Sequence, residues 1–303
     1  MRALVIDHSA PGGLRLADVP DPVPGPDEIL VRTAATSLNY GELPKTGNAA
    51  ATEGTVPGWD AAGTVERAAA SGAGPRAGDR VVTWGWAGGW AELRAVHVGE
   101  LAVLPDEVDF VRAAALPVAG LTALRALRRA GVRPGHRVAV TGASGGVGHF
   151  TVQLARLQGA EVVAVVGDPA RGAGLAELGA QRVVTKPEEI GDPVDVLLDN
   201  VGGPLLGALL GHMAEGGTVI SIGAASGQDT PLAPYQLVGK RLTLVGHQDG
   251  GRSAADLDHL ARLVADGRLK VSVSRVADWQ EVGEVADDVV GRRVRGKAVL
   301  TLS

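Results

Sequence analysis

A glycine-rich turn between an apolar strand and a helix constrains the fold of this chain more than any other stretch. Residues 138–148 read Val-Ala-Val-Thr-Gly-Ala-Ser-Gly-Gly-Val-Gly, and the amphipathic segment Phe150–Leu157 follows. Glycine is needed in such a turn wherever a Cβ atom would block the backbone, a bound pyrophosphate or the packing of helix on strand. Glycine is abundant here, at 44 of 303 residues, so the turn alone is a weak signal. A second apolar strand over 161–167 completes a βαβ unit, and in that context the turn predicts a dinucleotide-binding site.

The length and composition predict two domains and argue against a nucleic-acid partner. At 303 residues the chain exceeds the usual size of one domain, and its hydrophobic content of 45% is enough for sizeable cores. The net charge is −5, and Lys and Arg are scattered rather than gathered in a run that would follow a phosphate backbone.

The lack of cysteine and of long apolar runs argues against cysteine chemistry and against a membrane-spanning protein. Without cysteine the chain has no disulfide, no thiolate nucleophile and no cysteine-bearing zinc site. No apolar run approaches the roughly 20 residues that span a bilayer. The first residues, Met1–Asp7, predict a short strand that ends in a charge, unlike a signal peptide. We therefore expect a cytoplasmic protein without a membrane partner.

The pattern of predicted secondary structure changes once along the chain. Up to about residue 105, short β-like runs alternate with Pro and Gly clusters, which predicts a turn-rich β domain. From about 110 to 250, helical segments alternate with apolar strands, which predicts a doubly wound parallel sheet with strands at 138–141, 161–166, 182–184, 194–198, 217–222 and 241–245. The tail after Gly251 fits no further βα repeat. We therefore expect one domain over 1–110 together with 252–303 and a second over 111–251.

Seven short motifs are spread over nearly the whole chain. They are Ser37-Leu-Asn-Tyr-Gly-Glu42, Val56-Pro-Gly-Trp-Asp-Ala-Ala-Gly63, Gly78-Asp-Arg-Val81, Leu116-Pro-Val-Ala-Gly-Leu-Thr-Ala123, Gly142-Ala-Ser-Gly-Gly-Val-Gly148, Leu178-Gly-Ala180 and Gly296-Lys-Ala-Val-Leu300. In order and spacing they resemble the landmarks of zinc-independent medium-chain dehydrogenase/reductases of the quinone oxidoreductase (zeta-crystallin) type. The resemblance implies a GroES-like β domain made from both chain ends, a Rossmann domain between them, NAD(P)H as cofactor and, usually, a homodimer.

The chain departs from the zinc-dependent alcohol dehydrogenases of the same superfamily. Those enzymes carry a Cys in the loop that matches Ser37–Tyr40 and a Gly-His-Glu where this chain has Gly58-Trp59-Asp60, so two recognisable zinc-ligand positions are lost. The four-cysteine lobe that binds structural zinc is also missing. Without a Lewis acid, the resemblance implies hydride delivery to an already electrophilic acceptor such as a quinone or an enone.

Two residues after the second strand bear on the choice of cofactor. Asp168 stands about 20 residues beyond Gly148, where the general fingerprint places an acidic residue on the ribose of NAD. In the resembling family, however, the acidic position falls at or just before Gly167, and Arg171 falls where NADPH-dependent quinone reductases carry a basic residue for the 2′-phosphate. We therefore expect NADPH. The alternative is that Asp168 only caps the next helix and Arg171 is a solvated first-turn charge.

The other cofactor residues come from the turn, one helix and two strand ends. The resemblance places Thr122 near the nicotinamide amide, while by itself it is typical of a helix residue with a buried hydroxyl. Asn200 and Gly223 end two strands of the predicted sheet, where loops meet a ligand, although turn chemistry alone would also explain them. From the turn itself we expect cofactor contacts by Gly142, Ser144, Gly145, Gly146, Val147 and Gly148.

Two neighbouring residues are the candidates for catalysis. By resemblance their loop lies over the nicotinamide, where Asn39 could hydrogen-bond the ribose or the substrate carbonyl and the Tyr40 phenol could polarise that oxygen. The alternative is structural, because Asn is a common turn residue and a Tyr beside it often packs a barrel end. Trp84, Trp86 and Trp90 could stack on a flat acceptor or simply fill a small barrel.

The sequence therefore predicts an NADPH-dependent, metal-free reductase of a quinone or an α,β-unsaturated carbonyl compound. The alternative within enzymes is an enoyl or ene reductase of a biosynthetic pathway, for instance one acting on a polyketide intermediate. A cofactor-binding sensor or structural protein without turnover is the alternative from another class. The apolar run Arg241–Gly246 is a candidate edge strand that pairs with its two-fold mate in a homodimer.

Overall fold

The computed structural model describes residues 1–43 and 52–302. The chain divides into two compact units, one of Met1–Leu121 with Gly250–Ser303 and the other of Thr122–Asp249. Helix α2 (Pro117–Ala130) carries the chain from the first unit into the second. The domain limits expected from the sequence stay a prediction that limited proteolysis can test.

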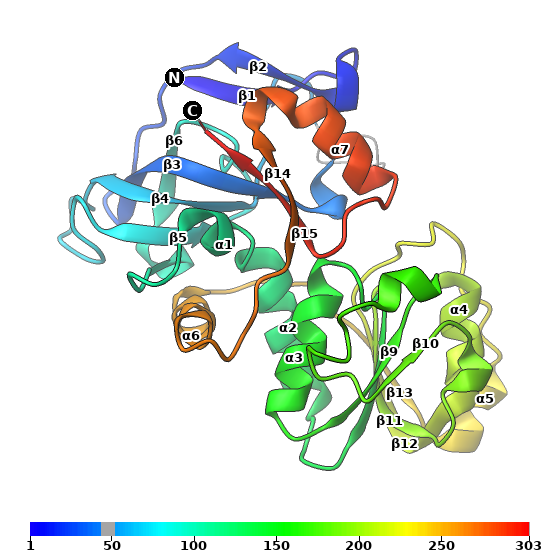
Figure 1. The fold of residues 1–303 in the computed structure, drawn as a ribbon. Helices are drawn as coiled ribbons and strands as arrows, with labels where there is room; N and C mark the ends of the chain where they lie inside the picture. Colours follow the sequence, from blue (N-terminus) through cyan, green and yellow to red (C-terminus); the bar gives the residue numbers. More distant parts are fainter. Residues whose placement is uncertain (44–51, 303) are drawn as a thin grey trace. The chain divides into compact units, whose positions relative to one another are not determined.

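The first unit is built on a seven-stranded sheet to which both chain ends contribute (Figure 1). The path of strands runs β14-β15-β3-β4-β5-β7, and β6 also pairs with β3. The closing strand β15 lies antiparallel to β3, with Ala298 opposite Leu38. Strand bounds are β3 Glu28–Leu38, β4 Asp60–Arg67, β5 Arg80–Trp84, β6 Leu93–His97, β7 Leu101–Val103, β14 Val273–Asp278 and β15 Lys297–Thr301.

A hairpin and several helices also belong to the described part of the first unit. The hairpin joins β1 (Arg2–Ile6) to β2 (Leu14–Asp18), and the sequence had predicted only the first of these strands. One buried cluster joins this hairpin to the chain end through Leu4, Trp90, Trp279 and Leu300. The helices of this unit are α1 Phe110–Ala114, α6 Ala254–Ala265 and α7 Val282–Val290.

The second unit is a doubly wound parallel sheet, as the sequence predicted. Its strand order is β10-β9-β8-β11-β12-β13, so the direction of winding reverses between β8 and β11. Ligands of such sheets bind beyond the carboxyl ends of the strands at this reversal. Strand bounds are β8 Arg137–Thr141, β9 Glu161–Val165, β10 Arg182–Val184, β11 Val194–Asp199, β12 Met213–Ser221 and β13 Thr243–Gly246; helix bounds are α3 Gly146–Leu157, α4 Gly203–Leu209 and α5 Pro234–Lys240.

Two local expectations in the second unit differ from the structure. Between β9 and β10 there is no regular helix but a single 3-10 turn, Pro169–Gly172, and glycines such as Gly174, with φ +81°, break the segment that follows. Strand β13 begins at Thr243 rather than at Arg241, because Arg241 adopts φ 51° as the left-handed cap of α5.

Across the described residues, we find no helix whose length and apolar character would let it traverse a bilayer.

Candidate functional site

The glycine-rich turn after β8 has a geometry that only glycine satisfies. Gly142 adopts φ +61° directly after the strand. At Gly148 a Cβ atom would lie 2.5 Å from the Cα atom of Ala143 and would also collide with the carbonyl oxygen of Gly142. Helix α3 starts at Gly146, so backbone and helix approach each other too closely for any side chain at Gly148.

Arg171 lies beside this turn. Its Nε atom donates a 2.8 Å hydrogen bond to the Oγ atom of Ser144, a buried residue of the turn. Asp168 uses Oδ1 to accept the backbone N–H of Ala170 at 2.7 Å, so its carboxylate caps the 3-10 turn that follows. Gly167 is exposed, and a Cβ atom there would meet no other atom within 4 Å. Of the two candidates for cofactor selection, Arg171 contacts the glycine-rich turn, whereas Asp168 contacts the 3-10 turn that follows it.

The carboxyl ends of β8, β11 and β12 are tied together by polar groups. The hydroxyl of Thr141 donates to Asp199 at 2.6 Å and accepts the backbone N–H of Asn200 at 2.9 Å. The Asn200 side chain donates to the Thr141 carbonyl, and the Gly223 N–H donates to the Asp199 carbonyl at 3.2 Å. Burial raises the pKa of Asp199, although hydrogen bonds from Thr141, Val201 and Gly202 oppose the rise. These contacts fix Asn200 and Gly223 at the edge where the turn lies.

Thr122 belongs to a second polar cluster in the same unit. Its hydroxyl donates a short hydrogen bond to Asp249. Arg125 lies 3.7 Å and His247 3.5 Å from the other carboxylate oxygen of Asp249. Among the described residues, both ring nitrogens of His247 are buried without a hydrogen-bond partner. The sequence identified Thr122 by resemblance, but nothing in the sequence pointed to its pairing with Asp249.

In the first unit, Asn39 is held at every polar atom of its side chain. The amide nitrogen donates to Glu42 Oε1 and to Asp60 Oδ2, both at 2.9 Å. The amide oxygen accepts from the Nζ atom of Lys297 at 2.5 Å. Its expected contact with ribose or substrate is untested and stays a prediction, and within this unit the side chain organises a buried polar network.

Two carboxylates and two cations form this buried network. Glu42 accepts the backbone N–H of Asn39 on one oxygen and that of Trp59 on the other. Burial and the neighbouring Asp60 raise the pKa of Glu42 to about 8, against the attraction of Lys297. Burial also lowers the pKa of Arg94 to about 10, although both carboxylates oppose that change.

Asp60 is the point where four segments meet. Its Oδ2 accepts from Ser37 at 2.7 Å and lies 3.4 Å from Lys297 Nζ, while its Oδ1 accepts the backbone N–H of Val118 at 2.9 Å. The network of Glu42, Asp60, Arg94 and Lys297 escaped the sequence analysis. The available signal was a charged residue at the border of an apolar strand, as in Lys297-Ala-Val-Leu.

Tyr40 follows Asn39 and is the first residue of the 3-10 turn Tyr40–Glu42. Its side chain is 40% exposed. The guanidinium of Arg292 lies 5.3 Å from the centre of its ring. An exposed phenol beside a cation can donate a hydrogen bond to an oxygen that gains negative charge, which is the property that the sequence assigned to Tyr40.

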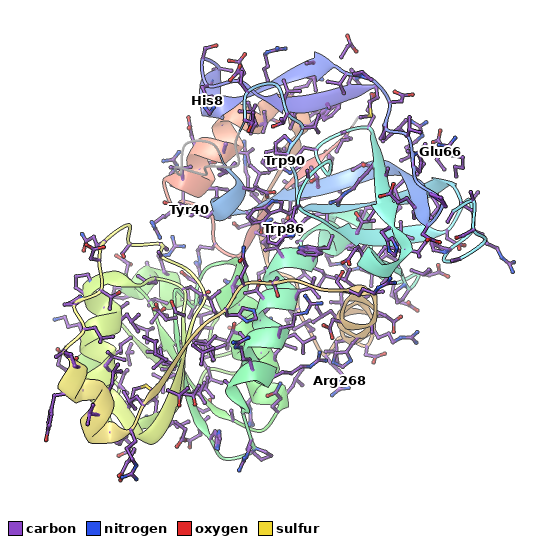
Figure 2. All side chains as sticks on the ribbon, turned by 180° about the vertical axis from the view of Figure 1, so that it is seen from behind. His8, Tyr40, Glu66, Trp86, Trp90 and Arg268 are labelled. Atoms are coloured by element: carbon purple, nitrogen blue, oxygen red, sulfur yellow. The ribbon has the colours of Figure 1, made fainter. Side chains whose placement is uncertain are left out.

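The three clustered tryptophans have different environments. Trp90 is fully buried and donates its indole N–H to the Ser37 carbonyl at 3.1 Å, and Trp84 is also buried. Both are core residues of the first unit, which agrees with the structural alternative that the sequence left open. Trp86 is 51% exposed and contacts Trp59 edge-on. Figure 2 labels Trp86 and the buried Trp90 in the first unit.

Metal ligation has no support in the geometry of the described residues, where no group of three or more His, Cys, Asp or Glu side chains is placed to hold an ion. The expectation that the protein needs no metal stays a prediction.

Comparison with known families places both parts of the chain in one superfamily. Residues 25–106 match the alcohol dehydrogenase GroES-like domain, and residues 146–266 match the zinc-binding dehydrogenase family.

Individual relatives agree with this result over the full chain. The chain is 30% identical to the acrylyl-CoA reductase AcuI of Ruegeria pomeroyi, with 99% of each protein covered. It is 27% identical to a quinone oxidoreductase of Mus musculus, with 100% of this chain and 98% of the relative covered. A solved structure of mycobacterial Rv1454c complexed with NADPH superposes with a TM-score of 0.86 at 26% identity, covering 99% of each chain. The chain therefore belongs to the medium-chain dehydrogenase/reductase family, and it is an NAD(P)-dependent oxidoreductase with a GroES-like and a Rossmann-type part.

Proposed function

We propose that this oxidoreductase uses NADPH to reduce a quinone or an α,β-unsaturated carbonyl compound without a metal ion. The observation that carries the proposal is the position of Lys297. Lys297 stands at the start of β15, and its ammonium group lies among the Leu38 carbonyl, Asn39 Oδ1 and Asp60 Oδ2. Leu38 and Asn39 belong to the loop that, by resemblance, matches the zinc-ligand loop of zinc-dependent relatives. A protein cation there neutralises Asp60, so the local carboxylate has a partner without a metal.

The residues of the second unit fit NADPH. The close approach at Gly148 leaves a bare backbone surface at the start of α3, which suits a pyrophosphate. Arg171, next to Ser144, offers a guanidinium that can pair with a 2′-phosphate. Asp168 uses one carboxylate oxygen to accept the Ala170 N–H and cap the 3-10 turn. This contact weakens the alternative in which Asp168 binds the ribose of NAD.

When bound, NADPH supplies a hydride from C4 of its nicotinamide. The acceptor gains that hydride at its electrophilic atom and gains a proton on the oxygen or carbon that becomes negative. We assign proton supply to water or to the exposed Tyr40 phenol, with Arg292 near the ring to stabilise developing negative charge. Because such acceptors are already activated, positioning and electrostatics supply most of the remaining rate.

A second candidate function is the reduction of an enoyl thioester. It is favoured by the relative from Ruegeria pomeroyi, an acrylyl-CoA reductase that matches this chain over its full length. An enoyl thioester is also an α,β-unsaturated carbonyl compound, so the same hydride and proton transfers apply.

The test is a spectrophotometric panel that follows NADPH at 340 nm with quinones, small enones and enoyl thioesters. We expect turnover with quinones and enones that persists after treatment with a chelator. Turnover confined to enoyl thioesters would establish the second candidate. If the protein binds NADPH with no turnover on any acceptor, the enzyme assignment fails in favour of a cofactor-binding sensor or structural protein.

A further inference from the structure

We propose that Trp59 and Trp86 form a binding face for a flat, fused-ring aromatic acceptor, in practice a naphthoquinone-like quinone. The inference rests on the proposed function and specifies its acceptor class.

The two indoles form an angled pair on the first unit. Their ring centres are 5.3 Å apart and their planes meet at 85°, and Trp84 contacts Trp86 at 5.2 Å and 64°. Trp86 keeps half of its surface exposed in this arrangement, and Trp59 is partly buried. A flat ring can therefore stack on one indole and meet the edge of the other, which are the two preferred aromatic geometries.

Trp86 is the most exposed of the five tryptophans. The chain has only five tryptophans, and Trp84, Trp90 and Trp279 are buried. Trp86 keeps half of its surface exposed and so contributes less to core packing than the three buried indoles. Together with the partly buried Trp59 it forms an aromatic surface of two indoles rather than a single exposed side chain.

The backbone around the pair is held by hydrogen bonds to the buried side chains of Glu42 and Arg94. The N–H of Trp59 donates to Glu42 Oε2 at 2.8 Å, and its carbonyl accepts from Arg94 Nη2 at 3.1 Å. The same Nη2 atom donates to the Ala87 carbonyl at 3.1 Å, and the Gly85 N–H donates to the Trp59 carbonyl at 3.0 Å. Residues on both sides of Trp86 are thus tied to Trp59, and a preorganised face loses little entropy when a ligand stacks on it.

The face adjoins the loop that carries the proposed proton donor. A Cβ atom on Gly41 would lie 3.3 Å from the Trp59 ring, so the loop that carries Tyr40 packs directly on this indole. An acceptor stacked on Trp59 would therefore lie beside this loop. Indole is electron-rich and a quinone ring is electron-poor, so stacking favours a quinone over an aliphatic enone or a thioester chain.

Acceptor selectivity is the kinetic test. We compare kcat/KM for a naphthoquinone with kcat/KM for a small aliphatic enone in the wild type, Trp86→Leu and Trp59→Leu. We expect the ratio to fall about tenfold in both variants, mainly through KM for the naphthoquinone. Trp86→Phe keeps a ring and should restore most of the ratio. Tyr235→Leu, which changes an exposed aromatic of the second unit, should keep the wild-type ratio.

Fluorescence gives a readout that does not need turnover. Titration of the protein with the oxidised naphthoquinone should quench tryptophan emission along a saturable curve, and Trp86→Leu should raise the half-saturating concentration about tenfold. An unchanged selectivity ratio in both leucine variants, or an unchanged half-saturating concentration in both, overturns the proposal. If the wild type oxidises NADPH with none of the acceptors, the proposed function fails, while the quenching curves still decide whether this face binds a fused ring.

Discussion

Lys297 Nζ lies 3.4 Å from Asp60 Oδ2 in the buried interior of the first unit, although 237 residues separate the two positions. Neither side chain has access to water that would solvate its charge. An isolated charge is costly in such a place, and a hydrogen-bonded pair is tolerated. Lys297, near the end of the chain, therefore supplies the cation that offsets the cost of burying the Asp60 carboxylate.

Replacing Lys297 by Met should destabilise the protein by about 3–5 kcal/mol, because the change removes the ion-pair partner of the buried Asp60 carboxylate. Urea unfolding monitored by tryptophan fluorescence measures the loss. Adding Asp60→Asn to Lys297→Met should recover part of it, since the carboxylate charge that lost its partner is then gone. Lys270→Met, at an exposed position, should change the free energy of unfolding little. A loss at Lys297 as small as at Lys270 would contradict the role of the pair.

Glu42 should make the protein less stable as the pH rises. Burial raises the pKa of Glu42 from 4.5 to about 8 in the folded state, so between these values the unfolded state has released a proton that the folded state keeps. The free energy of unfolding therefore falls from about pH 4.5 to about pH 8 through this group. In Glu42→Gln that part of the slope should disappear.

The measurement is the unfolding midpoint at several pH values across this window, compared with Glu177→Gln, which changes an exposed glutamate. An identical pH dependence in the wild type and in Glu42→Gln would show that this carboxyl does not titrate as the burial implies.

Arg171→Ala should weaken NADPH binding by roughly 1–3 kcal/mol and NADH binding little, because only NADPH has a 2′-phosphate to pair with the guanidinium. Arg171→Lys should lose less, since it keeps the charge. Isothermal titration with both cofactors measures the difference, and Arg133→Ala, at an exposed position, serves as the control. Equal losses for both cofactors, or a wild-type preference for NADH, would return the assignment to Asp168.

Activity should survive exhaustive dialysis against a chelator, and elemental analysis of the active protein should find no stoichiometric zinc. The sequence has no cysteine, and its resemblance to the family implies that Trp59 stands where zinc-dependent members carry a histidine ligand. Zinc at one equivalent whose removal abolishes turnover would make the metal-free assignment wrong.

The sequence predicted the second unit better than the buried network of the first. The glycine-rich turn is encoded within eleven consecutive residues, and its geometry follows from sterics that depend only on neighbours. The network around Asp60 joins residues from the two ends of the chain, and a strand pattern says which face a residue occupies but not which partner it meets. For the same reason, Trp59 could be matched to a family position, whereas its edge-on contact with Trp86 required the structure.

The edge strand β13 should form the contact of a homodimer. It is the last strand in the order of its sheet, and Leu244 is 42% exposed on it. Helix α5, which precedes β13 in the chain, also exposes Tyr235 and Val238. An unpaired edge of this kind is a liability, and pairing with its two-fold mate would extend the sheet across the axis.

Light scattering at micromolar concentration should therefore return twice the chain mass of 30.8 kDa. Leu244→Lys should shift the measured mass toward that of one chain, because it places a charge on each side of the axis. The matched control is Val183→Lys on β10, the opposite edge strand of the same sheet, which should leave the mass unchanged. A wild-type mass of one chain would remove the dimer, and a dimer that tolerates Leu244→Lys would move the contact away from β13.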